Sequence, residues 1–208
     1  MSTLSVNVPA LLLPLLLLLL SGCSLLQPVP PPAPEPQPVA DPLTAEIEQN
    51  YQQGLALMQN NAWADAAAHW QVMLEQGAEF AGIYTNLALA QLQLQDYAAG
   101  LAAAEKSRQL DEHYCPAWKT LALLQRHNGN FAAAEQSYLK AAACAPADAD
   151  IPFNLGILYD LYLQDLDNAL QQYQRAQQLI GTEDGTLAMW ITDLQRRQNN
   201  RVAKDGGQ

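Results

Sequence analysis

The chain has 208 residues and a formal net charge of −11. Its length allows one domain with short appendages, and its acidity excludes nucleic-acid binding, which needs a surplus of Lys and Arg to neutralise phosphates. Half of the residues are hydrophobic and only 15% are charged, and the many Gln and Ala residues are good helix formers.

Residues 1–22 contain no charged side chain, and nine leucines lie between Leu11 and Leu20, interrupted only by Pro14. The run is shorter than the roughly 20 apolar residues that span a bilayer, and its proline interrupts a helix. It therefore predicts the hydrophobic region of a secretory signal peptide.

This segment ends in Leu-Ser-Gly-Cys at residues 20–23. The ending resembles the lipobox of bacterial lipoproteins, in which a cysteine after small residues is acylated and becomes the mature N-terminus. The resemblance implies that residues 1–22 are a lipoprotein signal peptide and that palmitate and other acyl chains on Cys23 anchor the chain to a membrane. Under the sorting rule of that family, Ser24 in place of Asp favours the outer membrane, facing the periplasm. The alternative is an ordinary signal peptide that ends in cysteine.

Residues 23–42 form the predicted linker. From Pro28 to Pro42, eight of fifteen residues are proline, and because each proline fixes φ and lacks a donor, neither helix nor sheet is expected. The segment predicts polyproline II, which extends by about 3.1 Å per residue. It is either a spacer that holds the domain away from the membrane or a linker of no preferred length.

Aromatic residues recur every 34 positions, as Trp63, Tyr97 and Phe131. Small residues recur with the same period, namely Gly54, Ala88 and Ala122 before the aromatic residues and Ala66, Gly100 and Ala134 after them. A period of this length is typical of repeat architectures, whose units stack to bury their apolar faces.

The pattern closely resembles the tetratricopeptide repeat, in which each unit is a pair of antiparallel helices. The resemblance implies an all-α solenoid over residues 43–198, with about four helix-turn-helix repeats and a C-terminal capping helix. In the fourth unit the second helix is displaced by one residue, and we expect an insertion in the turn at 163–166. The predicted helices occupy 42–59 and 62–76, 79–93 and 96–110, 114–127 and 131–143, and 150–162 and 166–179.

The capping helix is predicted over 182–198, where Leu187, Trp190, Ile191 and Leu194 form an apolar stripe. This stripe either closes the solenoid, whose terminal repeat needs a polar outer face, or forms a docking surface through which the protein self-associates. Residues 199–208 are predicted to be disordered.

Catalytic and metal-binding patterns are not found. His69, His113 and His127 have no paired spacing, and a metal needs three or four ligands. The sequence contains no nucleophile elbow, phosphate-binding glycine loop or dinucleotide fingerprint. We therefore expect neither an enzyme nor a cofactor.

The resemblance also implies a concave face, lined by the first helix of each unit, that receives peptides or partner helices. The residues predicted to bind protein there are Tyr51, Leu55, Asn86, Leu89, Lys119, Leu123, Arg126, Phe153 and Ile157. The same face is expected to include Gln52, Met58, Thr85, Leu92, Thr120, Asn154 and Leu161. Some members of the family hold a peptide carboxylate with Lys, Asn and Arg on this face.

Asn86 and Lys119 match that carboxylate-binding pattern, whereas Tyr51 and Leu55 stand where it has Lys and Asn. The mostly apolar face suits a hydrophobic segment of a protein partner. The leucines either line this groove or are packed between helices.

Cys115 and Cys144 lie at the start of the first helix and the end of the second helix of the third unit, and these ends are neighbours in an antiparallel pair. An oxidising periplasm permits a disulfide between them. The alternative is two buried free thiols.

These features predict a lipoprotein, anchored in the outer membrane and facing the periplasm, that acts as a non-catalytic scaffold or assembly factor for an envelope machine. Its expected partners are a protein or peptide in the groove and the membrane through the lipid. The alternatives are a biogenesis lipoprotein of the type IV pilus or secretion type and a stand-alone peptide-binding module.

Overall fold

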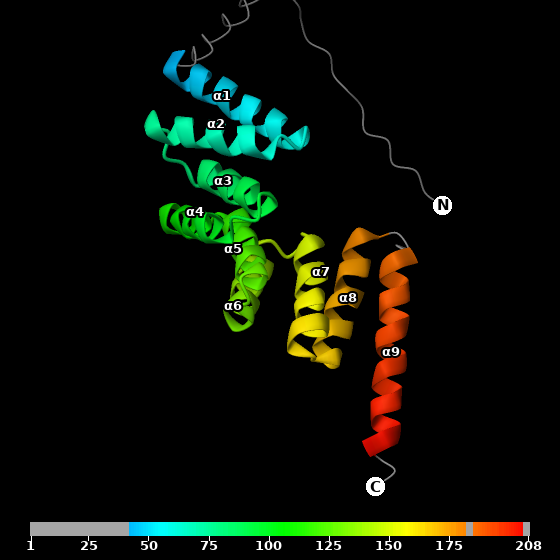
Figure 1. The fold of residues 1–208 in the computed structure, drawn as a ribbon. Helices are drawn as coiled ribbons and strands as arrows, with labels where there is room; N and C mark the ends of the chain where they lie inside the picture. Colours follow the sequence, from blue (N-terminus) through cyan, green and yellow to red (C-terminus); the bar gives the residue numbers. More distant parts are fainter. Residues whose placement is uncertain (1–41, 182–184, 206–208) are drawn as a thin grey trace, which may run out of the picture. The chain divides into compact units, whose positions relative to one another are not determined.

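The computed structural model describes residues 42–181 and 185–205, which lie in one compact unit, Ala40–Gln208 (Figure 1). The signal peptide, Cys23, nearly all of the linker and the predicted start of the capping helix at 182–184 lie outside the described residues. The helices are α1 (Pro42–Gln59), α2 (Trp63–Glu75), α3 (Ala81–Gln93), α4 (Tyr97–Leu110), α5 (Cys115–His127), α6 (Phe131–Cys144), α7 (Asp150–Ile157), the π-helix η1 (Leu158–Leu163), α8 (Leu166–Ile180) and α9 (Gly185–Asp205).

The helices form consecutive pairs, as the repeat period predicts. Each helix from α1 to α8 contacts the next helix along the chain, α8 contacts α9, and α3 also contacts α5 directly. The periodic aromatic residues Trp63, Tyr97 and Phe131 are the first residues of α2, α4 and α6. The predicted helix pairs are therefore confirmed to within a few residues at their ends.

The small periodic residues allow the two helices of a pair to approach closely. A Cβ atom on Gly54 would lie 2.4 Å from the ring of Trp70, and one on Gly156 would lie 2.4 Å from the ring of Tyr173. Both rings are buried, each in one of two apolar clusters, and the half-buried Trp118 packs against both clusters. The core is thus continuous from α2 to α9.

The turn inside each pair repeats with the same backbone conformation. A residue of positive φ precedes the second helix at Asn61, Gln95, Gly129 and Gln164. The first three follow the repeat period of 34, whereas Gln164 comes one position later than that period requires. The fourth unit therefore contains one extra residue.

The predicted position of that insertion was wrong. In the third unit Asn130 donates its backbone N–H to the carbonyl of Gln125, five residues back, whereas in the fourth unit Asp165 donates to Tyr159, six residues back. The extra residue therefore lies before the turn, where the helix widens into η1. A π-helix takes up one inserted residue without breaking the helix, so the predicted helix 150–162 is an α-helix only as far as Ile157.

The capping helix α9 extends further than predicted. Leu187, Ile191 and Leu194 are buried in the cluster of the last unit, so the apolar stripe closes the solenoid. Residues 199–205, predicted to be disordered, are helical instead. Gln198 and Arg201 both bond to Asp167 at the start of α8, and these contacts hold the end of α9 against the fourth unit.

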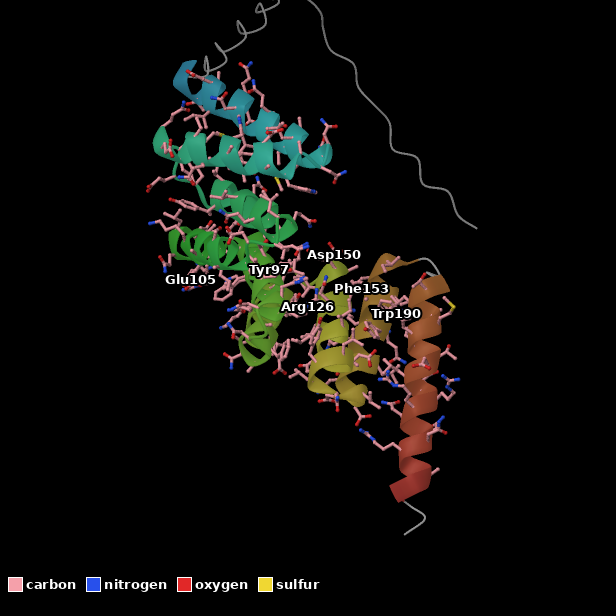
Figure 2. All side chains as sticks on the ribbon, in the orientation of Figure 1. Tyr97, Glu105, Arg126, Asp150, Phe153 and Trp190 are labelled. Carbon is pink, nitrogen blue, oxygen red and sulfur yellow. A yellow bond between two sulfur atoms is a disulfide. The ribbon has the colours of Figure 1, made fainter. Side chains whose placement is uncertain are left out.

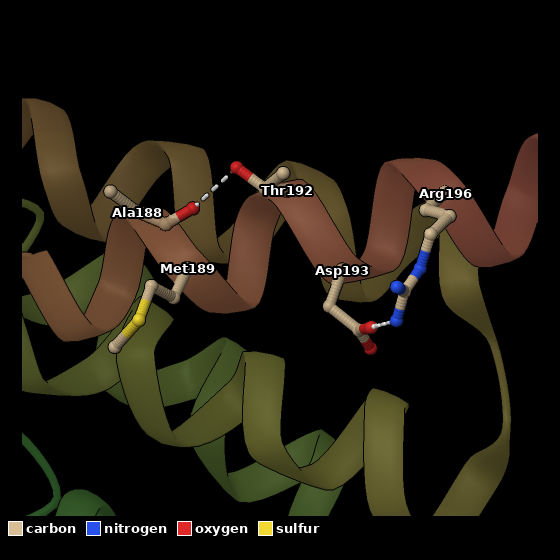
Figure 3. A pocket seen from close by; sticks show the side chains of 5 residues that line it. All are labelled: Ala188, Met189, Thr192, Asp193 and Arg196. Carbon is tan, nitrogen blue, oxygen red and sulfur yellow. Dashed lines mark hydrogen bonds and ion pairs between the residues drawn. The ribbon is translucent and has the colours of Figure 1, made fainter.

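The face of α9 opposite the stripe is partly hollowed. A hollow of about 440 Å³ is lined by Ala188, Met189, Thr192, Asp193 and Arg196, and Asp193 pairs with Arg196 within it (Figure 3). Met189 is one of the most exposed apolar side chains among the described residues. This surface is distinct from the predicted groove of the first helices.

Candidate peptide-binding groove

An apolar row runs across the first helices of the four units. Leu55, Leu89, Leu123 and Ile157 recur every 34 positions on α1, α3, α5 and α7, and each is half-buried. Leu55, Leu123 and Ile157 also pack against the buried clusters. The sequence leaves open whether these side chains line the groove or are packed between helices. The row does both, since three of its members pack against the core and all four are still partly exposed at the surface.

Polar residues on the first two helices of this face bond to one another. Asn86 donates its amide to the hydroxyl of Tyr51 over 3.0 Å, and the Tyr51 ring lies 5.2 Å from Trp70. Asn86 is only 9% exposed. This bond links α1 to α3 and occupies the amide group that matched the carboxylate-binding pattern.

Two other predicted members of the face lie beneath it. Thr85 and Thr120 are each 2% exposed. The hydroxyl of Thr85 bonds to that of Ser107 on α4 over 2.8 Å. These side chains lie between helices and are not available to a peptide.

Lys119 is held by two carboxylates. Its ammonium lies 2.7 Å from Asp148 and 3.3 Å from Asp150, and its side chain is 26% exposed. Burial alone lowers the pKa of Lys119, but the hydrogen bonds and negative charges of Asp148 and Asp150 outweigh it, so the pKa lies above its usual value. The lysine thus ties α5 to the start of α7.

Arg126, the other cation predicted in the groove, forms no ion pair with a carboxylate of the described residues. Its guanidinium donates to the amide oxygen of Asn154 over 3.3 Å, and its buried Nε has no hydrogen-bond partner. Among the ion pairs of the described residues, none joins Arg126 to a carboxylate. Figure 2 shows its place on α5, facing α7.

Phe153, another predicted contact residue, packs against the capping helix. Its ring stacks on Trp190 with centroids 5.7 Å apart, and Trp190 also touches Tyr173 at 5.6 Å (Figure 2). Trp190 retains 38% exposure. The capping helix therefore borders the groove at its C-terminal end.

The structure joins Cys115 and Cys144 in a disulfide, with Cα atoms 5.5 Å apart. The bond closes the open end of the α5–α6 pair, beside the loop that carries Asp148. Unit three is thus fixed at one end by the disulfide and to the fourth unit by Lys119.

The histidines have separate surroundings. His69 bonds to the carbonyl of Asn50 over 2.6 Å, and His127 stacks on Tyr97 at 5.4 Å. Burial and then the charge of Arg126 lower the pKa of His127. In the part of the chain that the structure describes, no group of three or more His, Cys, Asp or Glu side chains is arranged to hold a metal. No helix of this part is both long and apolar enough to cross a membrane.

Comparisons with known proteins reveal the fold. No family model and no curated protein matches the chain. It is similar to the solved structure of MamA 41-end from Desulfovibrio magneticus RS-1, with a TM-score of 0.64 and 16% sequence identity over 76% of this chain and 88% of that one. The chain has the tetratricopeptide-repeat fold.

Two further tetratricopeptide structures show the same likeness. TTC0263, a thermophilic TPR protein in Thermus thermophilus, has a TM-score of 0.63 and 20% identity over 71% of this chain and 80% of that one. YrrB, described as a TPR protein with an unusual peptide-binding site, has a TM-score of 0.60 and 18% identity over 72% and 76%. The predicted all-α solenoid is confirmed.

The tetratricopeptide pattern did not reveal every residue that shapes the groove. Asp148 and Asp150, which position Lys119, lie between units and at the first residue of α7, so the repeat period carries no signal for them. Asp160 and Arg197, an ion pair between η1 and α9, depend on the inserted residue and on the length of α9. Neither feature is visible in the repeat.

Proposed function

We propose that this protein is a non-catalytic scaffold that binds a segment of a partner protein along its first helices. The observation that carries the proposal is the apolar row of Leu55, Leu89, Leu123 and Ile157, which repeats with the period of the solenoid and remains partly exposed. A row of regularly spaced apolar side chains suits an amphipathic or extended hydrophobic segment.

The polar groups beside the row support such a segment better than a free peptide carboxylate. Asn86 and Lys119 are engaged with other side chains, which leaves Arg126 as the groove cation that lacks an acidic partner among the described residues. An arginine at the edge of an apolar row provides orientation, whereas the row provides the contact area. The description of YrrB as carrying a peptide-binding site is consistent with a peptide partner for this fold.

Placement at the outer membrane is the second part of the proposal. It is supported by the apolar run before Cys23 and by Ser24 after it. Three acyl chains, as bacterial lipoproteins carry, anchor a protein far more firmly than the marginal binding given by one. The acidic domain would then act in the periplasm as an assembly factor for an envelope machine.

Site-specific photocrosslinking in intact cells tests the groove. A photoreactive residue at position 89 should capture a discrete protein partner, because Leu89 lies in the middle of the row. The matched control is position 139, since Leu139 is also an exposed leucine (49%) but lies on the second helix α6. Equal capture at both positions would place the partner elsewhere.

Substitution gives the complementary test. Leu89→Glu puts a charge in the apolar row and should abolish the crosslink from position 123, while Leu139→Glu should leave it intact. Circular dichroism should show helical content unchanged in both variants. Lys119→Glu is a poorer choice, because it also breaks the ion pairs with Asp148 and Asp150.

The anchor is tested separately. Cys23→Ala removes the acylated side chain, and we expect the protein to leave the membrane fraction and to remain soluble after cell fractionation. A Cys23→Ala protein that still sediments with outer membranes would contradict the lipid anchor without affecting the groove.

A further inference from the structure

A second groove lies between α2 and α4, with α3 as its floor. It is open to solvent, has a volume of about 470 Å³, and has an apolar lining that includes Leu74, Tyr84, Leu87 and Ala103. Glu75 and Glu79 are exposed on its rim. We call it the α2–α4 groove.

This groove and the row at Leu89 use opposite sides of α3. Tyr84, Leu87 and Gln91 follow one another at steps of three and four along the chain and so share one face of the helix, whereas Asn86 and Leu89 point to the other. A partner in the α2–α4 groove therefore occupies a different surface from the one proposed above.

The next unit shows how an equivalent groove is filled. Arg108 and Trp118 stand one repeat period after Leu74 and Tyr84, and the guanidinium carbon of Arg108 lies 5.2 Å from the centre of the Trp118 ring. Arg108 also pairs with Glu105. The hydrogen bond from Arg108 holds the pKa of Glu105 below its usual value. A cation over an aromatic ring is stabilised by the charge distribution of that ring.

In the third unit the side-chain oxygen of Gln125 has a hydrogen-bond donor. Ser137 donates its hydroxyl to the side-chain oxygen of Gln125 over 2.7 Å. The residues one repeat period earlier are Ala103 and Gln91. Because alanine has no hydroxyl, the side-chain oxygen of Gln91 is buried with no hydrogen-bond partner, which is an unfavourable state for a polar group.

The α2–α4 groove thus has an aromatic ring on its floor, an unpaired amide oxygen and two carboxylates at its rim, but it has no cation like Arg108. These groups belong to Tyr84, Gln91, Glu75 and Glu79. No Lys or Arg is among the residues that line the groove, and residues 1–105 contain nine Asp and Glu residues and no Lys or Arg. The nearest cation along α4, Lys106, stands one turn beyond Ala102 and is exposed. In the fourth unit the cation at the equivalent repeat position, Arg175 of α8, does line the corresponding hollow and reaches the carbonyl of Pro146 at its edge.

We propose that the α2–α4 groove binds a basic segment of a partner protein, with an arginine or lysine side chain over the Tyr84 ring, much as Arg108 of α4 lies over Trp118 of α5. The aliphatic stem lies on Leu87 and Ala103, the cationic head lies over Tyr84, and the exposed Glu75 and Glu79 on the rim attract the charge. This proposal does not depend on the row at Leu89.

Fluorescence anisotropy with the full-length protein tests it. The probe is a short fluorescein-labelled peptide of alternating alanine and arginine, and the control peptide carries citrulline, which has the shape of arginine without its charge. We expect the arginine peptide to bind at physiological salt and the citrulline peptide to bind roughly tenfold more weakly or not at all, because charge-assisted hydrogen bonds are lost.

Matched variants separate the groove from general attraction to an acidic protein. Ala102→Arg places a cation in the groove, and Ala98→Arg places the same charge elsewhere on α4; both alanines are exposed and only Ala102 lines the groove. Ala102→Arg should weaken the arginine peptide roughly tenfold, and Ala98→Arg should change its affinity little. Glu79→Gln should weaken binding about threefold, and Glu46→Gln on α1 should not, since exposed pairs contribute modestly.

Three results would overturn the proposal. Equal binding of the citrulline peptide would show that charge is not recognised. Equal losses in Ala102→Arg and Ala98→Arg would show attraction by net charge alone, and no binding of the arginine peptide would show that the groove takes no cation. Ala102→Arg should leave the crosslink from position 89 unchanged, because that crosslink reports on the apolar row and not on the α2–α4 groove. The two proposals can therefore fail separately.

Discussion

At the scale of single residues, the close approach of Gly54 to Trp70 is the sharpest packing constraint of the first unit. Trp70 is fully buried and cannot retreat from a side chain on α1. In a helix, alanine is more favourable than glycine by about 1 kcal/mol, whereas overpacking a core costs about 1–3 kcal/mol. Because the added Cβ would lie only 2.4 Å from the Trp70 ring, the cost is at the upper end of that range, and we expect Gly54→Ala to lower the free energy of unfolding by up to about 2 kcal/mol, measured by urea denaturation followed by circular dichroism.

Gly185→Ala is the control for this prediction. A Cβ atom on Gly185 at the start of α9 meets no heavy atom within 4 Å, so the free energy of unfolding should stay within about 0.5 kcal/mol of the original value. If Gly54→Ala were as stable as Gly185→Ala, α1 would not lie as close to Trp70 in solution.

The periodic small and aromatic residues could be predicted from the sequence because the same contact recurs in every unit. The engagement of Asn86 by Tyr51 could not, because it joins two units through a polar pair that does not follow the repeat. The pairing of Lys119 with Asp148 and Asp150 also joins two units and also does not follow the repeat. The sequence therefore predicts which helix faces are close, but not which polar groups on them are already satisfied.

At the scale of helices, Asp165 determines where α8 begins. Its carboxylate accepts the backbone N–H of Asn168 over 3.1 Å and the side-chain amide of the same residue over 2.7 Å. These hydrogen bonds hold the pKa of Asp165 below its usual value. We expect Asp165→Ala to lower the free energy of unfolding by about 1 kcal/mol at neutral pH, as loss of an N-cap does; urea denaturation measures the change.

The pH dependence follows from the direction of that shift. A carboxyl whose pKa is depressed by folding contributes stability above its unfolded pKa, about 3.9, and loses it as the pH falls through the lower folded value. Asp165→Asn retains an acceptor but not the charge. The stability difference between the original protein and the Asp165→Asn variant should therefore be largest near neutral pH and shrink below about pH 4; a difference independent of pH would show that charge plays no part.

Helix ends were predicted well where the turn repeats and poorly where it does not. The positive φ at Gly129 is expected of glycine, but Asn61, Gln95 and Gln164 adopt the same conformation without a glycine signal. The sequence shows that α8 is shifted by one residue. It does not show where the extra residue lies, because that depends on which backbone hydrogen bonds change to the wider π-helical spacing of η1. The extension of α9 depends on contacts with Asp167, which are remote in sequence.

At the scale of the whole solenoid, stability is a sum over units and the interfaces between neighbours. The third unit connects the first two units to the fourth, so a loss of order there separates the ends of the stack. The disulfide between Cys115 and Cys144 fixes this unit at its open end, with a sequence separation of 29 residues. A cross-link of this span raises the free energy of the unfolded chain by about 3.5 kcal/mol in the chain-entropy model.

We therefore expect the protein with both Cys115→Ser and Cys144→Ser to have a free energy of unfolding about 3.5 kcal/mol lower than that of the oxidised protein, measured by urea denaturation without reductant. Dithiothreitol should lower the stability of the original protein toward that of the double variant and leave the variant unchanged, because the variant has no Cys115–Cys144 bond to reduce. Alkylation of the denatured, unreduced protein should label neither Cys115 nor Cys144. Labelling of both, together with equal stability of the two proteins, would mean that the two thiols are free in solution and that the third unit is held by packing and by Lys119 alone.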